Sequence, residues 1–268
     1  MNRSSWSDDG NALGHSAVLP QGRVVTRWRA AGVHVSASIV MALILLGLIL
    51  NVWYPAPLFE AVGGREIFFL LLGVDVILGP LMTLVVFNSA KKSLKLDLTV
   101  IVLLQAVALV YGLHVLWAGR PVYVAALGHR FDVIQASEIS PDDIKTSGRD
   151  LPKWGPEWVG IRRPDNAEER NNMMFSAIGG VDYGHKPQYH AAIGTMKDEL
   201  LKEASPIADL RARNKAQDAE ISAWLAARSR SDNDVRFQGL KARSQDMAVI
   251  LDAKTAEVIG IAPFKPWD

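Results

Sequence analysis

The chain has 268 residues, 49% of them apolar, with a formal net charge of +1 and no cysteine. The near-neutral balance and the lack of a long Lys or Arg run argue against a nucleic-acid-binding protein, which needs a basic face for phosphate contacts. Without cysteine, disulfides, thiol catalysis and cysteine-held metal centres are excluded. Charge is unevenly spread, since 8 basic and 6 acidic residues precede residue 118, whereas 21 and 22 follow it.

Three apolar stretches in the first part of the chain are long enough to cross a membrane. Residues 33–52, 67–87 and 98–117 contain among them a single charged residue, Asp75. At 1.5 Å rise per residue, about 20 helical residues span a hydrocarbon core of about 30 Å. The sequence therefore predicts three transmembrane helices, which place the two ends of the chain on opposite sides of the membrane.

Basic residues in the short flanks predict the orientation of these spans. Three Arg residues precede the first span and three Lys residues separate the second from the third: Arg23, Arg27, Arg29, Lys91, Lys92 and Lys95. Because cytoplasmic flanks are rich in Lys and Arg, we expect residues 1–32 to form a cytoplasmic tail, disordered over residues 1–21. Residues 118–268 then lie outside, in the periplasm of a Gram-negative bacterium, and the protein is expected in the inner membrane.

Aromatic residues mark the ends of the spans. Trp28, Trp53, Tyr54 and Trp117 stand where amphipathic rings favour the membrane–water interface, and we interpret them as interface anchors. A cleaved signal peptide is the competing interpretation of the first span. It is disfavoured because the apolar run is longer than a usual signal-peptide core and no small-x-small cleavage site follows it.

The region after the spans is predicted to be a small α+β domain. Residues 121–127 and 131–133 favour strands and flank a Gly-His turn, which predicts a hairpin. The short apolar runs 247–251 and 258–261 predict a second hairpin. Four prolines between residues 140 and 172 suggest an irregular loop or hinge.

A helical pattern runs over residues 195–229 and is interrupted at Ser205 and Pro206. Ser205 is expected to cap a second helix, with Pro206 at its first position. Three apolar residues of this stretch would share one helix face: Ile221, Trp224 and Leu225.

Asp75 is the sharpest anomaly in the spans, because a carboxylate near the centre of a membrane helix costs about 2.5–3.5 kcal/mol on insertion-based scales. Gly79 and Pro80 follow one turn later, and Pro80 leaves the carbonyl of Val76 without its helical donor. One interpretation is a protonated Asp75 bonded to that carbonyl or to Tyr111, which lies at a similar depth. The other is that Asp75 meets a polar or cationic group on a partner's transmembrane helix. Gln105 and His114 would need helix tilt to reach it.

Motifs for catalysis are missing from the sequence. It contains no Gly-x-Ser-x-Gly elbow and no Gly-rich phosphate loop. His185 and His190 are five residues apart across a proline, a weak metal pair that we interpret as surface-loop histidines. Trp residues in the external region could anchor a partner, although core packing or membrane contact is the favoured interpretation: Trp154, Trp158 and Trp267. We expect no enzymatic activity, cofactor, metal, nucleic acid or small-molecule substrate.

The order of residues through the spans resembles the TfpX/TfpZ family of type IV pilin accessory proteins. The resemblance depends on an ordered series of short motifs: Arg27-Trp28-Arg29, His34, Trp53-Tyr54-Pro55, Leu71-Leu72-Gly73-Val74-Asp75, Gly79-Pro80-Leu81-Met82-Thr83, Lys91-Lys92-Ser93-Leu94-Lys95, Gln105, Tyr111-Gly112, Arg120-Pro121-Val122 and Arg130-Phe131. It is strong over residues 27–139 and looser beyond them.

The resemblance implies an inner-membrane factor that assists assembly or surface display of a cognate type IV pilin by binding it, without catalysis. We expect the spans to bind the pilin's transmembrane helix and the external domain to bind its head. The candidate binding residues are Asp75, Gly79, Pro80, Met82, Tyr111 and Trp224. The alternatives are a membrane-bound enzyme that modifies or processes pilin, and a sensory module that reports pilin level.

Overall fold

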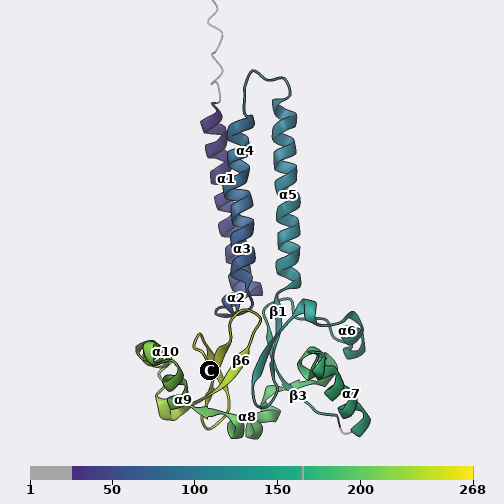
Figure 1. Ribbon diagram of the computed structural model, residues 1–268, viewed down its shortest axis with the longest axis vertical. Helices are drawn as coiled ribbons and strands as arrows, with labels where there is room; N and C mark the ends of the chain where they lie inside the picture. Colours follow the sequence, from purple (N-terminus) through teal and green to yellow (C-terminus); the bar gives the residue numbers. More distant parts are fainter. Residues whose placement is uncertain (1–25, 165, 268) are drawn as a thin grey trace, which may run out of the picture.

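The computed structural model describes residues 26–164 and 166–267, so the predicted disordered tail over residues 1–21 lies outside the described part. A long bundle of three helices stands on a domain with a curled sheet and flanking helices (Figure 1). This arrangement confirms the predicted architecture of three long apolar helices followed by an α+β domain.

The three rods are long and apolar enough to cross a membrane: Arg27–Trp53, Gly64–Val86 and Leu94–Ala118. The first comprises α1 (Arg27–Leu48) and a π-helical turn, η1 (Ile49–Trp53), and the third is α5 (Leu94–Ala118). Each predicted span lies inside one rod, except for Phe87, which ends the second. The short helix α2 (Leu58–Ala61) connects the first rod to the second.

The second rod is irregular beside Pro80, where the sequence leaves the Val76 carbonyl without its helical donor. It comprises α3 (Gly64–Leu72), a π-helical turn, η2 (Gly73–Leu78), and α4 (Gly79–Val86). The wide turn directly precedes Pro80, which cannot donate a backbone hydrogen bond into the preceding turn. Asp75 lies on this wide turn.

The domain after the rods, residues 119–267, is called the external domain because it lies outside the helix bundle. It contains one eight-stranded sheet in the order β4-β3-β1-β2-β6-β7-β8, with the short β5 paired to β6. The strands are β1 (Pro121–Ala126), β2 (Phe131–Gln135), β3 (Glu157–Ile161), β4 (His190–Ala192), β5 (Ser205–Pro206), β6 (Val235–Lys241), β7 (Met247–Asp252) and β8 (Val258–Ala262). Both predicted hairpins are present, as the antiparallel pairs β1–β2 and β7–β8. A short parallel pairing of β2 with β6 joins the two halves of the sheet.

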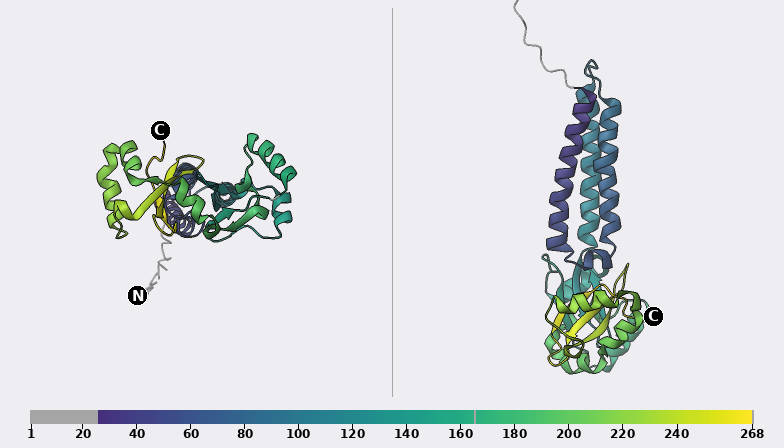
Figure 2. Two further views of the ribbon diagram at one scale, coloured as in Figure 1. Left: turned by 90° about the horizontal axis from the view of Figure 1, so that it is seen from below. Right: turned by 90° about the vertical axis from the view of Figure 1, so that its left-hand side faces the viewer.

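The external domain also contains the short helices α6 (Pro141–Ser147), α7 (Ala167–Ile178), α8 (Lys197–Glu203), α9 (Ile207–Arg213) and α10 (Asp218–Ala226). They lie toward the two outer sides of this domain, α9 and α10 on one side and α6 and α7 on the other, and α8 lies between the two sides (Figure 1 and Figure 2). The predicted irregular loop over residues 140–172 is wrong in part, because α6, β3 and the start of α7 lie within it and Pro141 begins α6 behind a Ser140 cap, whereas residues 148–156 form neither helix nor strand. The predicted Ser205 cap is also wrong, since Ser205 pairs with β6 and α9 begins after Pro206 without a side-chain cap.

The base of the bundle and the sheet share one hydrophobic core. Ile49, Tyr54 and Leu58 pack there with residues of β1, β2, β6 and β7. The backbone N–H groups of Ser244 and Gln245, in the β6–β7 turn, both donate to the Ala61 carbonyl, at 2.8 and 3.1 Å. Apolar packing and these two bonds therefore fix the domain to the end of the bundle.

Candidate functional site

An open groove of about 320 Å³ runs along the bundle between α1 and α5. It exists because α3 and α4 pack between the other two rods and hold them apart. Its walls are mostly apolar, with four polar exceptions: His34, Ser38, Asp75 and Gln105. The groove therefore offers an apolar surface with a polar centre inside the span region.

Asp75 lies at this polar centre without full hydrogen bonding. Its Oδ1 is buried and accepts no hydrogen bond from any described residue. Gln105 Nε2 donates to the backbone oxygen of Asp75 at 3.3 Å, and Gln105 Oε1 is likewise buried and unpaired. An unsatisfied buried polar atom is costly, so both side chains can gain by meeting a donor supplied from the groove.

The predicted internal partners of Asp75 are not the ones observed. Tyr111 is 68% exposed and makes no hydrogen bond to Asp75, and no bond joins the carboxyl group to the Val76 carbonyl among the described contacts. Gln105 takes the neighbouring position because Gly79 leaves room for it: a Cβ on Gly79 would collide with the Gln105 amide. The glycine singled out by the sequence thus shapes the site.

His34 links α1 to α4 beside the groove. Its Nδ1 lies 2.8 Å from Thr83 Oγ1, and Thr83 donates to the Gly79 carbonyl at 3.1 Å. A hydroxyl has one proton, so Thr83 accepts from His34 while it donates to Gly79. Pro80 is buried next to this chain of bonds.

The remaining predicted binding residues lie elsewhere. Met82 is 43% exposed on the outside of the bundle and does not line the groove. Tyr111 lines a different pocket, at the junction with the external domain. Trp224 lies on α10, where its ring packs over Gly260 and under the Arg228 guanidinium, 3.7 Å from the ring centre. The structure thus brings together Asp75 and the Gly79-Pro80 pair and separates the other three.

The predicted interface anchors also differ among themselves. Trp53 and Trp117 pack edge to face with ring centres 5.2 Å apart, at the external ends of their rods, whereas Trp28 is exposed at the other end. Tyr54 is wrong as a lipid-facing anchor, because it is 1% exposed and its hydroxyl donates to the Leu116 carbonyl at 2.6 Å. It joins the ends of the first and third rods.

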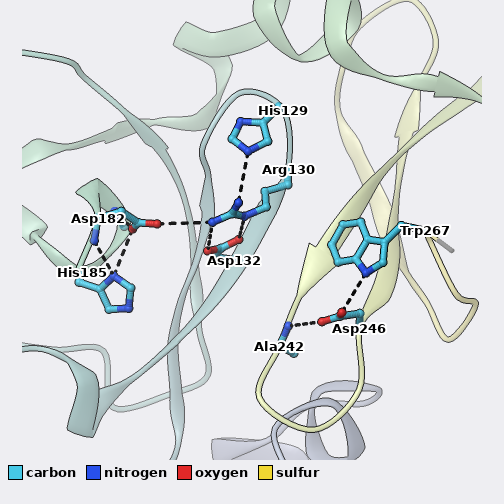
Figure 3. Close-up of polar contacts among 9 residues, drawn as sticks. His129, Arg130, Asp132, Asp182, His185, Ala242, Asp246 and Trp267 are labelled. Atoms are coloured by element: carbon cyan, nitrogen blue, oxygen red, sulfur yellow. Dashed lines mark hydrogen bonds and ion pairs between the residues drawn. The ribbon is translucent and has the colours of Figure 1, made fainter. Parts of the chain in front are cut away.

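The external domain contains a cluster of ion pairs that no sequence pattern predicts (Figure 3). Arg130 donates to both oxygens of Asp132, at 2.6 and 3.0 Å, and lies 3.7 Å from Asp182, which contacts His185 Nδ1 at 3.1 Å. The hydrogen bond with Asp182 raises the pKa of His185. Burial opposes ionisation of Asp182, but its bonds to His185 and the Gly184 N–H and the Arg130 charge outweigh burial and lower its pKa.

This cluster does not have the form of a metal site. Across residues 26–164 and 166–267, no three His, Asp or Glu side chains are grouped closely enough to hold a metal ion. The cluster borders a polar cleft of about 260 Å³ that Lys241 and Arg243 also line, at the junction of the two sheet halves. His185 is therefore engaged in an ion-pair network rather than free in a surface loop.

Three rods long and apolar enough to cross a membrane, with a mostly apolar groove between two of them, are joined to a domain with a curled sheet and helices. The sequence profile of the fimbrial assembly protein FimB family matches residues 22–63, which include α1, η1 and α2. Two relatives from Dichelobacter nodosus, named fimbrial assembly protein of serogroup I and of serogroup E1, are each 30% identical over 231 residues, 84% of this chain and 90% of theirs.

A third Dichelobacter nodosus relative, the fimbrial assembly protein of serogroups C1 and C2, is 33% identical over 118 residues, 43% of this chain and 90% of its own length. No solved structure matches the chain. The chain belongs to the fimbrial assembly protein family. The narrower TfpX/TfpZ resemblance stays a prediction.

Proposed function

We propose that this protein is a membrane accessory factor of fimbrial assembly that binds a type IV pilin before or during its incorporation. In this proposal the groove between α1 and α5 receives the pilin's transmembrane helix, and the external domain contacts the pilin head. The names of the relatives support the role in assembly. The apolar rods and the distribution of Lys and Arg support an inner-membrane position with the N-terminus in the cytoplasm and the C-terminus in the periplasm.

The observation that carries the proposal is the unpaired Oδ1 of Asp75 at the floor of an apolar groove. Helices in lipid gain no hydrophobic energy by associating, so packing and polar contacts must drive association. A helix seated in the groove would pack against apolar walls and could supply a hydrogen-bond donor or cation to Asp75. Lipid chains could fill the same space but would leave Oδ1 of Asp75 unpaired.

Photocrosslinking in cells tests the groove. A photoreactive residue at Ala106, which lines the groove, should capture pilin, whereas one at the neighbouring Val107, which is exposed and outside it, should not. Equal capture at both positions, or at neither with normal protein levels, would refute groove binding. A photoreactive residue at Trp224 tests the contact with the pilin head in the same experiment.

Substitution of Asp75 tests the polar contact. Asp75→Leu, made at normal levels, should reduce both pilin capture from position 106 and surface pili, while Asp75→Asn should retain part of both because an amide still bonds. Normal piliation in Asp75→Leu cells would contradict this role.

A non-catalytic mode is part of the proposal. Deleting the gene should lower the number of pili without changing the intact mass of pilin. A changed pilin mass in the deletion strain would instead favour a modifying or processing enzyme.

A further inference from the structure

Trp154 is the most exposed large apolar side chain in the described part of the chain, at 81%. It lies in the loop between α6 and β3, next to the exposed Lys153. An isolated exposed Leu or Val needs no explanation, but an indole costs more to leave in water because of its large apolar area. The position of this loop indicates what covers the ring.

The loop is bonded to the external end of the third rod. Arg120, only 5% exposed, donates to the Trp117 carbonyl at 2.6 Å and to the Pro152 carbonyl at 3.3 Å. The same guanidinium lies over the Trp117 ring, 3.5 Å from its centre. One buried side chain therefore ties the loop to the last turn of α5.

The loop also touches the end of the first rod. Gly155 has φ +73°, a left-handed conformation that favours glycine, and a Cβ built there would lie 3.7 Å from the Val52 carbonyl. Trp154, Gly155 and Pro156 line a pocket of about 450 Å³ together with residues 51–52 and 55–58, where the first rod leaves the bundle. Trp154 is thus held level with the external ends of two apolar rods.

We propose that Trp154 and Lys153 enter the headgroup region of the outer leaflet and rest the external domain on the phospholipid surface. The indole is apolar over most of its area and carries one N–H donor, a combination favoured where acyl chains meet headgroups. The neighbouring ammonium can approach lipid phosphates. Because two rods fix the height of the loop, a bilayer around the bundle brings its interface to Trp154, together with Trp53 and Trp117. This inference rests on the membrane position given under the proposed function.

Single-cysteine labelling tests the proposal, since the natural chain contains no cysteine. Full-length Trp154→Cys protein, labelled with the fluorophore NBD, would be placed in phosphatidylethanolamine–phosphatidylglycerol vesicles without pilin. We expect blue-shifted emission and several-fold stronger quenching by headgroup-region nitroxide lipids than for the control Phe175→Cys. Phe175 is also exposed, at 67%, but lies on α7, at the lower right of Figure 1.

A second control separates failure of this inference from failure of the membrane position. A label at Val107, exposed midway along α5, should be quenched by nitroxides deep in the acyl chains. If Val107 is quenched but position 154 behaves as position 175 does, the lipid contact is refuted while the membrane position stands. Protection of position 154 only after pilin is added would also refute it and assign the loop to a protein partner. With native tryptophans, Trp154→Ser should lose part of the quenching by brominated headgroup-proximal lipids.

Discussion

Arg120 should be the polar residue that contributes most to joining bundle and external domain. In Arg120→Met, the stem still packs but the Trp117 and Pro152 carbonyls lose their donor and the Trp117 ring loses its cation. Hydrogen bonds from a charged group contribute about 1.5–3 kcal/mol each and a cation–π contact about 0.5–2 kcal/mol. Burial disfavours the charge and lowers the pKa of Arg120, which offsets part of this gain. We expect a net loss of about 2–3 kcal/mol.

Thermal unfolding of the full-length protein in detergent, followed by tryptophan fluorescence, measures the effect. At about 2–4 °C per kcal/mol for a chain of this size, the Tm should fall by roughly 5–10 °C. Arg149→Met is the matched control, because Arg149 makes one exposed pair with Glu157 at 3.5 Å, and such pairs contribute about 0–1 kcal/mol. If Arg120→Met and Arg149→Met melt at the same temperature, the reasoning about Arg120 is refuted.

Three further substitutions test the packing, the C-terminal segment and the ion cluster. Gly112→Ala would place a Cβ against the Leu71 side chain and should destabilise the bundle by about 1–3 kcal/mol. In the control Gly47→Ala the new Cβ meets no other atom, so the Tm should be unchanged or higher. Equal Tm values for the two variants would contradict this packing. Asn214→Leu removes three hydrogen bonds, one to the Leu210 carbonyl and two to the backbone groups of Lys265, at about 1 kcal/mol each. The C-terminal segment should then become sensitive to limited proteolysis. An unchanged digestion pattern would contradict the role of Asn214 in holding this segment. Because folding raises the pKa of His185, its ion pair with Asp182 stabilises the folded protein fully below the ordinary His pKa of about 6.5, and this stabilisation is lost as pH rises through the raised value. The Tm of the wild-type protein should therefore fall more from pH 6 to pH 8.5 than the Tm of His185→Gln. Parallel curves of Tm against pH would contradict the ion pair.

The rods could be predicted from sequence because lipid imposes a simple requirement, a long uncharged run. The partner of Asp75 could not. The rise per residue predicts that Tyr111 is level with Asp75 and that Gln105 needs helix tilt to reach it, but depth along a helix axis ignores side-chain reach and the space that Gly79 leaves for the Gln105 amide. The exposed ring of Tyr111 shows that equal depth does not imply that two side chains face each other.

In the external domain, prediction succeeded for local pairings. The hairpins β1–β2 and β7–β8 depend on neighbouring residues and short turns, which a sequence pattern records. The parallel contact of β2 with β6 joins segments about a hundred residues apart, and nothing in either strand specifies the other. The ion cluster depends on the same kind of long-range contact, because Arg130 and Asp182 are distant in sequence and no local pattern around either residue specifies the other.

The bond pair between the β6–β7 turn and Ala61 has a mechanical consequence. Since that carbonyl ends α2, directly between the first and second rods, the sheet cannot swivel on its covalent link to α5 alone. The sheet is therefore attached to the bundle at two separate points, the covalent link from α5 and the bonds to Ala61, and these two attachments together fix its orientation relative to the rods.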